Sequence, residues 1–258
     1  MFADPPTCDL LSLQLTDHRK PFTDPLEGSP WSSRETVAGF AQSVPNDRLM
    51  RYAESLSSSA PLRVIDVGCG AGRNLVPLAR MGCRVLGVDL SWPMLCAAAE
   101  RVRTEHLADR VTLAVASMHD LPAPRQTADL VVAHGIWNLA RSATELRRAI
   151  AEAARVSAPG AGLFVFTFSR NTLPPNARPV AGEPFVFTQF SGQPQTFLTA
   201  QQLASELASA GFLPDPAVPL TEHNKRPAGA LSTGGPPVIY EAAFRLRSEP
   251  LPSVPRGL

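Results

Sequence analysis

The 258-residue sequence has no excess of charge of either sign and few cysteines. Its 24 lysines and arginines nearly balance its 23 acids, and the formal net charge is +1. Charge therefore gives no argument for a nucleic-acid or an anionic-membrane partner. The four cysteines, at positions 8, 69, 83 and 96, form no CxxC pair and have no histidine at a ligand spacing. This argues against a zinc site and a disulfide framework, and it favours buried thiols in a reducing cytoplasm.

The sequence also lacks long apolar segments. No apolar run approaches the roughly 18 residues that a membrane-spanning helix requires. The N-terminal stretch has neither a basic start nor an unbroken apolar run, so no secretory signal is predicted. We therefore expect a cytoplasmic protein without a membrane partner.

Short β-branched runs alternate with amphipathic segments through the chain. Strands are predicted at 63–68, 84–90, 111–117, 128–135, 162–169, 217–223 and 238–247. Helices are predicted at 32–44, 46–59, 73–82, 91–107, 142–160 and 199–212. Proline, at 26 residues, gathers near both ends and in the second half, where it indicates loops. The pattern predicts an α/β fold: a doubly wound, mostly parallel, seven-stranded Rossmann-like sheet with an antiparallel last strand and helices on both faces.

Three glycines follow the first predicted strand, in the stretch VIDVGCGAG at 64–72. Gly68, Gly70 and Gly72 permit a tight turn whose backbone comes close to a ligand. Asp89 ends the next predicted strand, about 20 residues on, where a carboxylate can accept both hydroxyls of an adenosine ribose. Because the carboxyl ends of parallel strands meet at one edge of the sheet, the turn and the acid predict a site for an adenosine-containing ligand.

Two cofactor classes fit this site, dinucleotides and S-adenosylmethionine. The dinucleotide fingerprint is GxGxxG, but here the pattern is GxGxG and Arg73 stands at the position of the last glycine. Asp66, two residues before the turn, would repel a pyrophosphate and attract a sulfonium or an ammonium group. The residues favour a ligand with a cationic end, and an NAD(P)-dependent oxidoreductase is the weaker alternative.

The segments VIDVGCGAGRN, VLGVDLS, ADLVVAHG and GLFVFTFS resemble, in order and spacing, the motifs of class I S-adenosylmethionine-dependent methyltransferases. The resemblance covers about 62–170 and extends as topology over 199–246. It implies transfer of a methyl group from S-adenosylmethionine to a small-molecule thiol, amine, hydroxyl or similar nucleophile, leaving S-adenosylhomocysteine. The implied domains are an N-terminal irregular and helical lid over 1–60, a cofactor-binding domain over 61–247 with an acceptor-side insertion at 170–198, and a proline-rich tail over 248–258.

The resemblance also implies roles for individual residues. The cofactor-binding residues would be Arg34, Asp66, Gly68, Cys69, Gly70, Asp89, Leu90, Met94, Ser117, Met118, Ala133 and His134. In this assignment Asp66 and the glycines line the amino acid portion, Asp89 holds the ribose, and Leu90 packs on the adenine. Ser117 stands where many relatives carry an acid that meets the adenine.

Several candidates have two interpretations. His134 either acts as a general base on an acceptor O–H or N–H or only bonds to a backbone carbonyl. Arg34 either pairs with the methionine carboxylate or is an ordinary surface arginine. The candidate acceptor-site residues are Trp31, Trp137, Asn138, Phe187 and Phe190, although core packing is an equal alternative for Trp137.

Other subclass signals are negative in the sequence. No (D/N)PP(Y/F) motif follows the fourth predicted strand, and the charge balance gives no basic face, so a small-molecule acceptor is favoured over a nucleic acid. No metal site is predicted. The remaining alternative is a non-catalytic protein of the same fold that binds S-adenosylmethionine.

Overall fold

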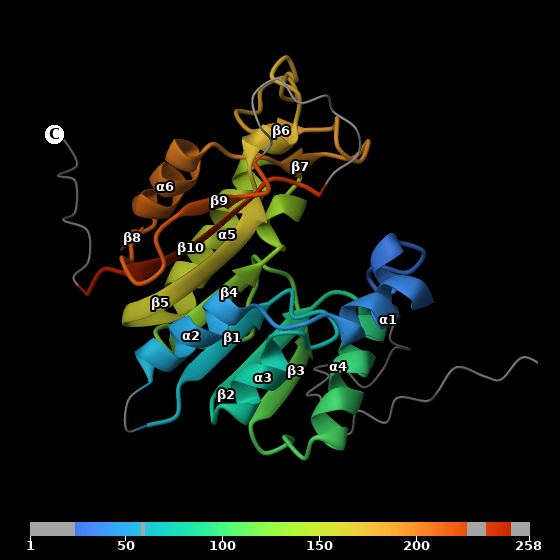
Figure 1. The fold of residues 1–258 in the computed structure, drawn as a ribbon, viewed down its shortest axis with the longest axis vertical. Helices are drawn as coiled ribbons and strands as arrows, with labels where there is room; N and C mark the ends of the chain where they lie inside the picture. The colour runs from blue at the N-terminus through green and yellow to red at the C-terminus, as the bar shows by residue number, and fades with distance from the viewer. Residues whose placement is uncertain (1–23, 58–59, 226–235, 249–258) are drawn as a thin grey trace, which may run out of the picture.

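The computed structural model describes residues 24–57, 60–225 and 236–248. Its centre is a mixed sheet with helices on both faces (Figure 1). The strands of this sheet are β1 (Arg63–Val67), β2 (Arg84–Asp89), β3 (Val111–Val115), β4 (Ala128–His134), β5 (Ser157–Phe168), β8 (Phe212–Pro214), β9 (Thr221–His223) and β10 (Ile239–Leu246). The α-helices are α1 (Arg34–Gln42), α2 (Asp47–Leu56), α3 (Leu75–Arg80), α4 (Trp92–Thr104), α5 (Ala143–Val156) and α6 (Ala200–Ser209).

The strand order is β3-β2-β1-β4-β5-β10-β8, and β9 also pairs with β10. Strands β1 to β5 are mutually parallel, whereas β10 is antiparallel to β5, β8 and β9. The chain winds outward through β2 and β3 and then returns to place β4 on the other side of β1. A doubly wound sheet binds its ligands at such a switch point, so the carboxyl ends of β1, β2 and β4 are the edge of interest. The predicted fold class is confirmed, and the described sheet has eight strands because the short β8, which was not predicted, also pairs with β10.

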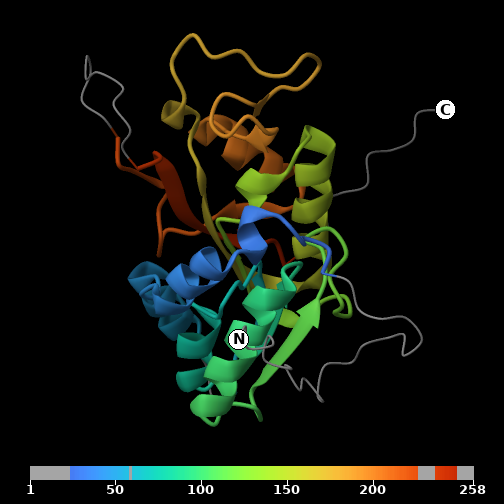
Figure 2. The same cartoon turned by 90° about the vertical axis from the view of Figure 1, so that its right-hand side faces the viewer.

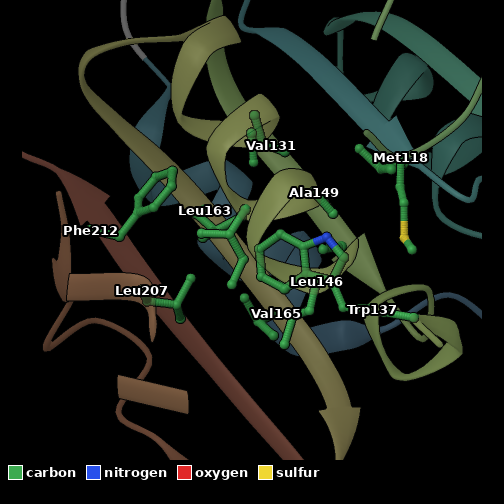
Figure 3. Close-up of a cluster of buried hydrophobic side chains, with 14 of the residues drawn as sticks. Met118, Val131, Trp137, Leu146, Ala149, Leu163, Val165, Leu207 and Phe212 are labelled. Atoms are coloured by element: carbon green, nitrogen blue, oxygen red, sulfur yellow. The ribbon is translucent and has the colours of Figure 1, made fainter. Parts of the chain in front are cut away.

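Two hydrophobic clusters cover the two faces of the sheet. On one face Leu146 of α5 and Leu207 of α6 pack with Val165 of β5 (Figure 3). On the other face Tyr52 of α2 packs with Phe164 of β5, together with apolar residues of α3 and α4. Successive residues of β5 thus enter opposite cores, as expected of a central strand that is buried on both sides.

Several predicted boundaries shift for local reasons. The helix predicted to end at a Pro-Gly pair ends at Val156, and Pro159 and Gly160 lie inside β5. They fall at an irregularity in the β4–β5 register, where an unpaired proline is tolerated. Helix α3 is shorter than predicted because turns occupy 71–74, and Pro77 stands in its first helical turn, where its missing N–H has no partner to lose.

Residues between β5 and α6 form a separate small substructure. They include the 3₁₀ helix η3 (Arg170–Thr172) and a two-stranded sheet of β6 (Val186–Phe187) and β7 (Gln195–Thr196), which the sequence pattern did not predict. Figure 2 shows this segment, in gold and orange, at one end of the molecule. Two further 3₁₀ helices are η1 (Pro30–Ser32) and η2 (Trp137–Leu139).

The predicted lid and tail lie only partly within the described residues. Positions 1–23 and 249–258 are outside them, so the division into lid, domain and tail stays a prediction. Within the predicted lid, α2 is part of the core, because its Leu49, Tyr52 and Ala53 are fully buried against the sheet. Among the described helices, none combines the length and apolar character that crossing a bilayer would need.

Candidate functional site

The glycine turn lies at the carboxyl end of β1. Gly68, Gly70 and Gly72 have φ values of 71°, 51° and 80°, in the left-handed region that glycine adopts without strain. A Cβ on Gly68 would stand 2.9 Å from side-chain atoms of Ile136, in the loop after β4. The turn therefore needs glycine both for its conformation and for the close approach of the β4 loop.

Hydrogen bonds tie the turn to the end of β2. The Val88 carbonyl accepts from the N–H groups of Gly68, at 2.8 Å, and Cys69, at 3.0 Å. The Gly70 N–H donates to Oδ2 of Asp89 at 2.9 Å. The turn and the acid that the sequence placed at one edge are thus in direct contact.

Asp89 is held in place on its other side by the start of α4. Its Oδ1 accepts from the Ser91 N–H at 2.8 Å, whereas Ser91 itself is the N-cap and accepts from the Met94 N–H. Burial raises the pKa of Asp89, and these backbone donors partly oppose the rise. Asp89 therefore does not cap α4, and its carboxylate, which can accept about four hydrogen bonds, retains capacity for a further donor.

Asp66, near the end of β1, is a buried acid without a counter-ion. It is 2% exposed, and its Oδ2 has no hydrogen-bond partner among the described residues. Burial, and to a lesser extent the charge of Asp89, raises its pKa to about 7. An unpaired buried carboxylate oxygen is costly, so this atom marks a place for an external donor.

These two acids allow a test of which cofactor fits. A pyrophosphate would bring negative charge next to Asp66 and Asp89, where no described ion pair neutralises either acid. An ammonium or a sulfonium group would instead supply the missing donor and the missing positive charge. The residues present therefore fit S-adenosylmethionine better than a dinucleotide. No group of three or more metal-ligating side chains occurs in the described part of the chain.

The N-terminal segment contacts this edge from outside the sheet. The Trp92 N–H donates to Oδ1 of Asp24 at 3.2 Å, and the Ser91 hydroxyl donates to the Trp31 carbonyl at 3.0 Å. The Trp31 ring meets the ring of Phe40 edge-on at 5.9 Å. Phe40 in turn lies 3.8 Å from where a Cβ on Gly70 would stand. The segment thus covers the glycine turn and the first turn of α4.

The other predicted cofactor residues divide into two groups. Core side chains are those of Cys69, Met118 and Ala133. Burial of these side chains in the two cores leaves their backbone atoms as the groups that could serve a ligand. Met94 has its sulfur 3.9 Å from a Cβ position on Gly70, beneath the turn. Residues with at least partly exposed side chains are Arg34, Leu90 and Ser117.

Trp137 requires a correction. The sequence allowed either an acceptor-pocket wall or core packing, and the structure shows core packing: its ring is 1% exposed and packs with Leu146 and Val165 (Figure 3). The reason is that η2 turns the chain back onto the sheet directly after β4. The Trp137 carbonyl also accepts a hydrogen bond from the Thr196 hydroxyl of β7, at 2.8 Å, which joins this loop to the insertion.

The remaining acceptor candidates are not gathered at one place. Phe187, a candidate acceptor-site residue, is instead buried in a small cluster with Phe197 and Leu173. Phe190 is 46% exposed and meets the half-buried Phe168 of β5 edge-on at 5.2 Å. Asn138 is buried, and its Oδ1 has no partner among the described residues. Phe190 and Asn138 thus remain available to a ligand, whereas Phe187 stabilises the insertion.

His134 ends β4 on the same face of the sheet as Asp66. Their strands pair in register, with Asp66 opposite Val132, so His134 lies level with the start of the glycine turn. Its ring stacks on Phe166 of β5, with centroids 4.2 Å apart. Burial, followed by the positive charge of Arg73, lowers its pKa to about 4. The imidazole is therefore neutral at physiological pH.

The structure adds site residues that the sequence pattern missed. Asn46 approaches His134 with its side-chain nitrogen at 3.3 Å and Glu241 of β10 with the same atom at 2.5 Å. Asn46 carried one signal, its position as a helix cap, but nothing in the sequence gave its partners. Ile136 and Asp24 were missed because both act through packing or hydrogen bonds over long separations in sequence.

Comparison with known proteins agrees with this geometry. A family model described as a methyltransferase domain matches residues 64–160. A demethylmenaquinone methyltransferase of Lactiplantibacillus plantarum is 32% identical over 176 residues, covering 61% of this chain and 72% of the relative. A ubiquinone biosynthesis O-methyltransferase of Rhodopseudomonas palustris is 32% identical over 121 residues, covering 47% of this chain and 45% of the relative. The chain thus spans only about half the length of the latter.

A solved structure shows the same fold. The crystal structure of a SAM-dependent methyltransferase from Methanosarcina mazei has a TM-score of 0.63 and 19% sequence identity, covering 80% of this chain and 100% of the other. In this chain the glycine turn and the two acids lie at the switch point of a doubly wound sheet. The chain therefore belongs to the class I S-adenosylmethionine-dependent methyltransferases.

Proposed function

We propose that this protein transfers the methyl group of S-adenosylmethionine to a small-molecule acceptor. The observation that carries the proposal is the buried Asp66 carboxylate, which has an unpartnered oxygen beside Asp89 and the glycine turn. No described arginine or lysine pairs with either acid. A ligand that carries its own positive charges supplies what the site lacks.

In the proposed complex each end of the cofactor has its own residues. Asp66, with the backbone of Gly68 and Gly70, binds the amino acid portion. Asp89 accepts hydrogen bonds from the ribose hydroxyls with the acceptor capacity that its backbone donors leave free. The adenine is enclosed by the half-buried Leu90 and Ser117 and by the backbone near Met94 and Met118, and Arg34 remains a candidate for the carboxylate.

The chemistry requires little from the protein beyond orientation. Bound S-adenosylmethionine supplies a methyl group that is already activated by its sulfonium. The glycine turn fixes the position of the donor, and the segment around Trp31 and Phe40 excludes water from it. The acceptor approaches from the carboxyl ends of β4 and β5, where His134 and Phe166 form a stacked floor.

The names of the relatives support a small acceptor. One is named as an O-methyltransferase of ubiquinone biosynthesis and the other as a demethylmenaquinone methyltransferase. Both names describe methylation of small molecules. The half-exposed aromatic side chains of β5 and the exposed Phe190 suit an acceptor with an apolar or planar body.

Calorimetry with S-adenosylhomocysteine tests the cofactor assignment. We expect binding by the wild type, at least tenfold weaker binding by Asp89→Ala, and no comparable effect of Asp109→Ala, a solvent-exposed acid away from the site. Binding of NADH in place of S-adenosylhomocysteine, or an unchanged affinity of Asp89→Ala, would refute it. Incubation with methyl-labelled cofactor and a panel of thiols, phenols and amines then separates an enzyme from a protein that only binds the cofactor.

A further inference from the structure

The polar side chains beside His134 form a cluster that is separate from Asp66 and Asp89, the acids proposed to bind the cofactor. Asn46 stands at its centre, between His134 of β4 and Glu241 of β10. Glu241 is only 5% exposed, and its Oε2 lies 3.0 Å from Nη1 of Arg48 and 3.3 Å from Nε2 of His223. This cluster lies next to the proposed site of methyl transfer, and the cofactor assignment gives it no role. The role inferred for it rests on the proposed function.

The side-chain amide of Asn46 has a fixed orientation. Asn46 is the N-cap of α2, and its Oδ1 accepts from the Leu49 N–H at 3.0 Å. The oxygen is therefore committed, and the nitrogen faces the interior of the cluster. Its backbone N–H donates to Oδ1 of the buried Asn74 at 3.0 Å, which anchors the residue from a second side. A flipped amide would lose the cap and place an oxygen against the Glu241 carboxylate.

This orientation fixes the proton of His134. The Asn46 nitrogen has two hydrogens: one is donated to Oε1 of Glu241 at 2.5 Å, and the other points to Nε2 of His134 at 3.3 Å. A donor can face only a nitrogen that carries no proton. The neutral imidazole therefore has its proton on Nδ1, and its Nε2 lone pair is directed at Asn46.

The charges around His134 do not favour its protonation. Arg73, before α3, acts on the ring with a positive charge and helps to lower its pKa. Glu241 would attract an imidazolium, but its Oε2 is already paired with the Arg48 guanidinium at 3.0 Å. Asp66, on the same face of the sheet, has its pKa raised to about 7, and in the proposed complex it binds the cofactor. A second cation beside a bound sulfonium would also weaken cofactor binding.

We propose that Asn46 and Glu241 are positioning residues that hold the His134 imidazole neutral, so that the methyl acceptor brings a nucleophile that is already ionised near neutral pH, such as a thiolate or the anion of an acidic phenol. The anion's electron pair forms the new bond to the methyl carbon while the carbon–sulfur pair returns to sulfur. No proton is transferred to the protein in this step. His134 serves as part of the stacked floor with Phe166 and does not act as general base.

The proton on His134 can be observed directly. In ¹⁵N-detected NMR of the wild type with S-adenosylhomocysteine, we expect a neutral Nδ1–H tautomer throughout the neutral pH range. Asn46→Ser keeps a good helix cap but removes both amide donors, and it should raise the His134 protonation constant at least tenfold. Glu241→Gln, which keeps the shape, should loosen Asn46 and shift the same resonances. An Nε2–H tautomer in the wild type, or unchanged resonances in Asn46→Ser, would overturn the proposal.

Kinetics with thiols and phenols of graded acidity test the consequence. We expect kcat/KM to follow the ionised fraction of each acceptor. His134→Gln removes part of the acceptor floor, so it should lower kcat/KM by a similar factor for ionised and un-ionised acceptors, because no proton passes through the ring. A loss of a hundredfold or more in His134→Gln with an un-ionised acceptor would show that His134 is a base. Binding of S-adenosylhomocysteine by all variants keeps this outcome separate from failure of the proposed function.

Discussion

The buried Asp66 gives a quantitative prediction about stability in the absence of cofactor. Its pKa rises from the ordinary 3.8 to about 7 in the folded protein, chiefly because of burial. A raised folded-state pKa means that the contribution to stability is complete below the unfolded pKa and is lost as pH rises through the folded pKa. At 1.36 kcal/mol per pKa unit, the loss between these two values amounts to about 4 kcal/mol.

The substitution Asp66→Asn removes this titration and preserves the shape of the side chain. Between pH 5 and 7 the free energy of unfolding of the wild type should fall relative to the variant by about 2–3 kcal/mol. The stability of the wild type alone would not isolate Asp66, because the lowered pKa of His134 has the opposite effect. The stability that His134 contributes is present above pH 6.5 and is lost as pH falls from 6.5 toward its folded-state pKa of about 4. His134 is common to both proteins and its effect cancels.

Urea unfolding monitored by circular dichroism at closely spaced pH values measures this difference. A constant difference between wild type and Asp66→Asn across the window would refute the assigned pKa. Calorimetry supplies a second readout, because the cofactor's ammonium needs the ionised acid. With a pKa of about 7, only about a tenth of Asp66 is ionised at pH 6, so S-adenosylhomocysteine should bind about tenfold more weakly there than at pH 8.

Three further substitutions test the frame of the site. Gly68→Ala places a methyl 2.9 Å from Ile136 at a positive φ and should cost about 1–3 kcal/mol in urea unfolding, with weaker S-adenosylhomocysteine binding by calorimetry. Trp137→Ala empties a fully buried core position and should cost about 3–5 kcal/mol, and a change below 1 kcal/mol would contradict its placement. Ser91→Ala removes the cap of α4 and should cost about 1 kcal/mol, measured in the same way.

The sequence could predict the fold because local patterns and the global arrangement agree. The β-branched runs at 63–68 and 84–90 are buried on both faces in the structure, and the glycines after the first run adopt the left-handed conformations that a tight turn needs. Asp89 was placed correctly beside the turn, because its spacing and the parallel pairing of the strands suffice. The β6–β7 hairpin was missed because two-residue strands leave no period to detect.

The acceptor side could not be predicted, because its contacts join residues far apart in sequence. Asn46 and Glu241 are separated by 195 positions and meet only because α2 packs on the face of β10. Trp137 and Phe187 were candidates for the acceptor site, but the sequence could not decide between a pocket and a core, because aromatic residues suit both. Their burial depends on how η2 and the insertion fold back, and neither has a sequence signature.

Two features at this edge of the sheet determine which charges the site carries. Asp66 and Asp89 leave negative charge unneutralised at a cost in stability, and only a ligand with a cationic end offsets that cost. At the end of β4, Asn46 keeps His134 uncharged, so that no second cation repels the sulfonium. The site is therefore arranged around a positive charge that the protein does not itself supply. A nucleophile that arrives as an anion completes the balance, because the sulfonium and the acceptor neutralise each other as the methyl group moves.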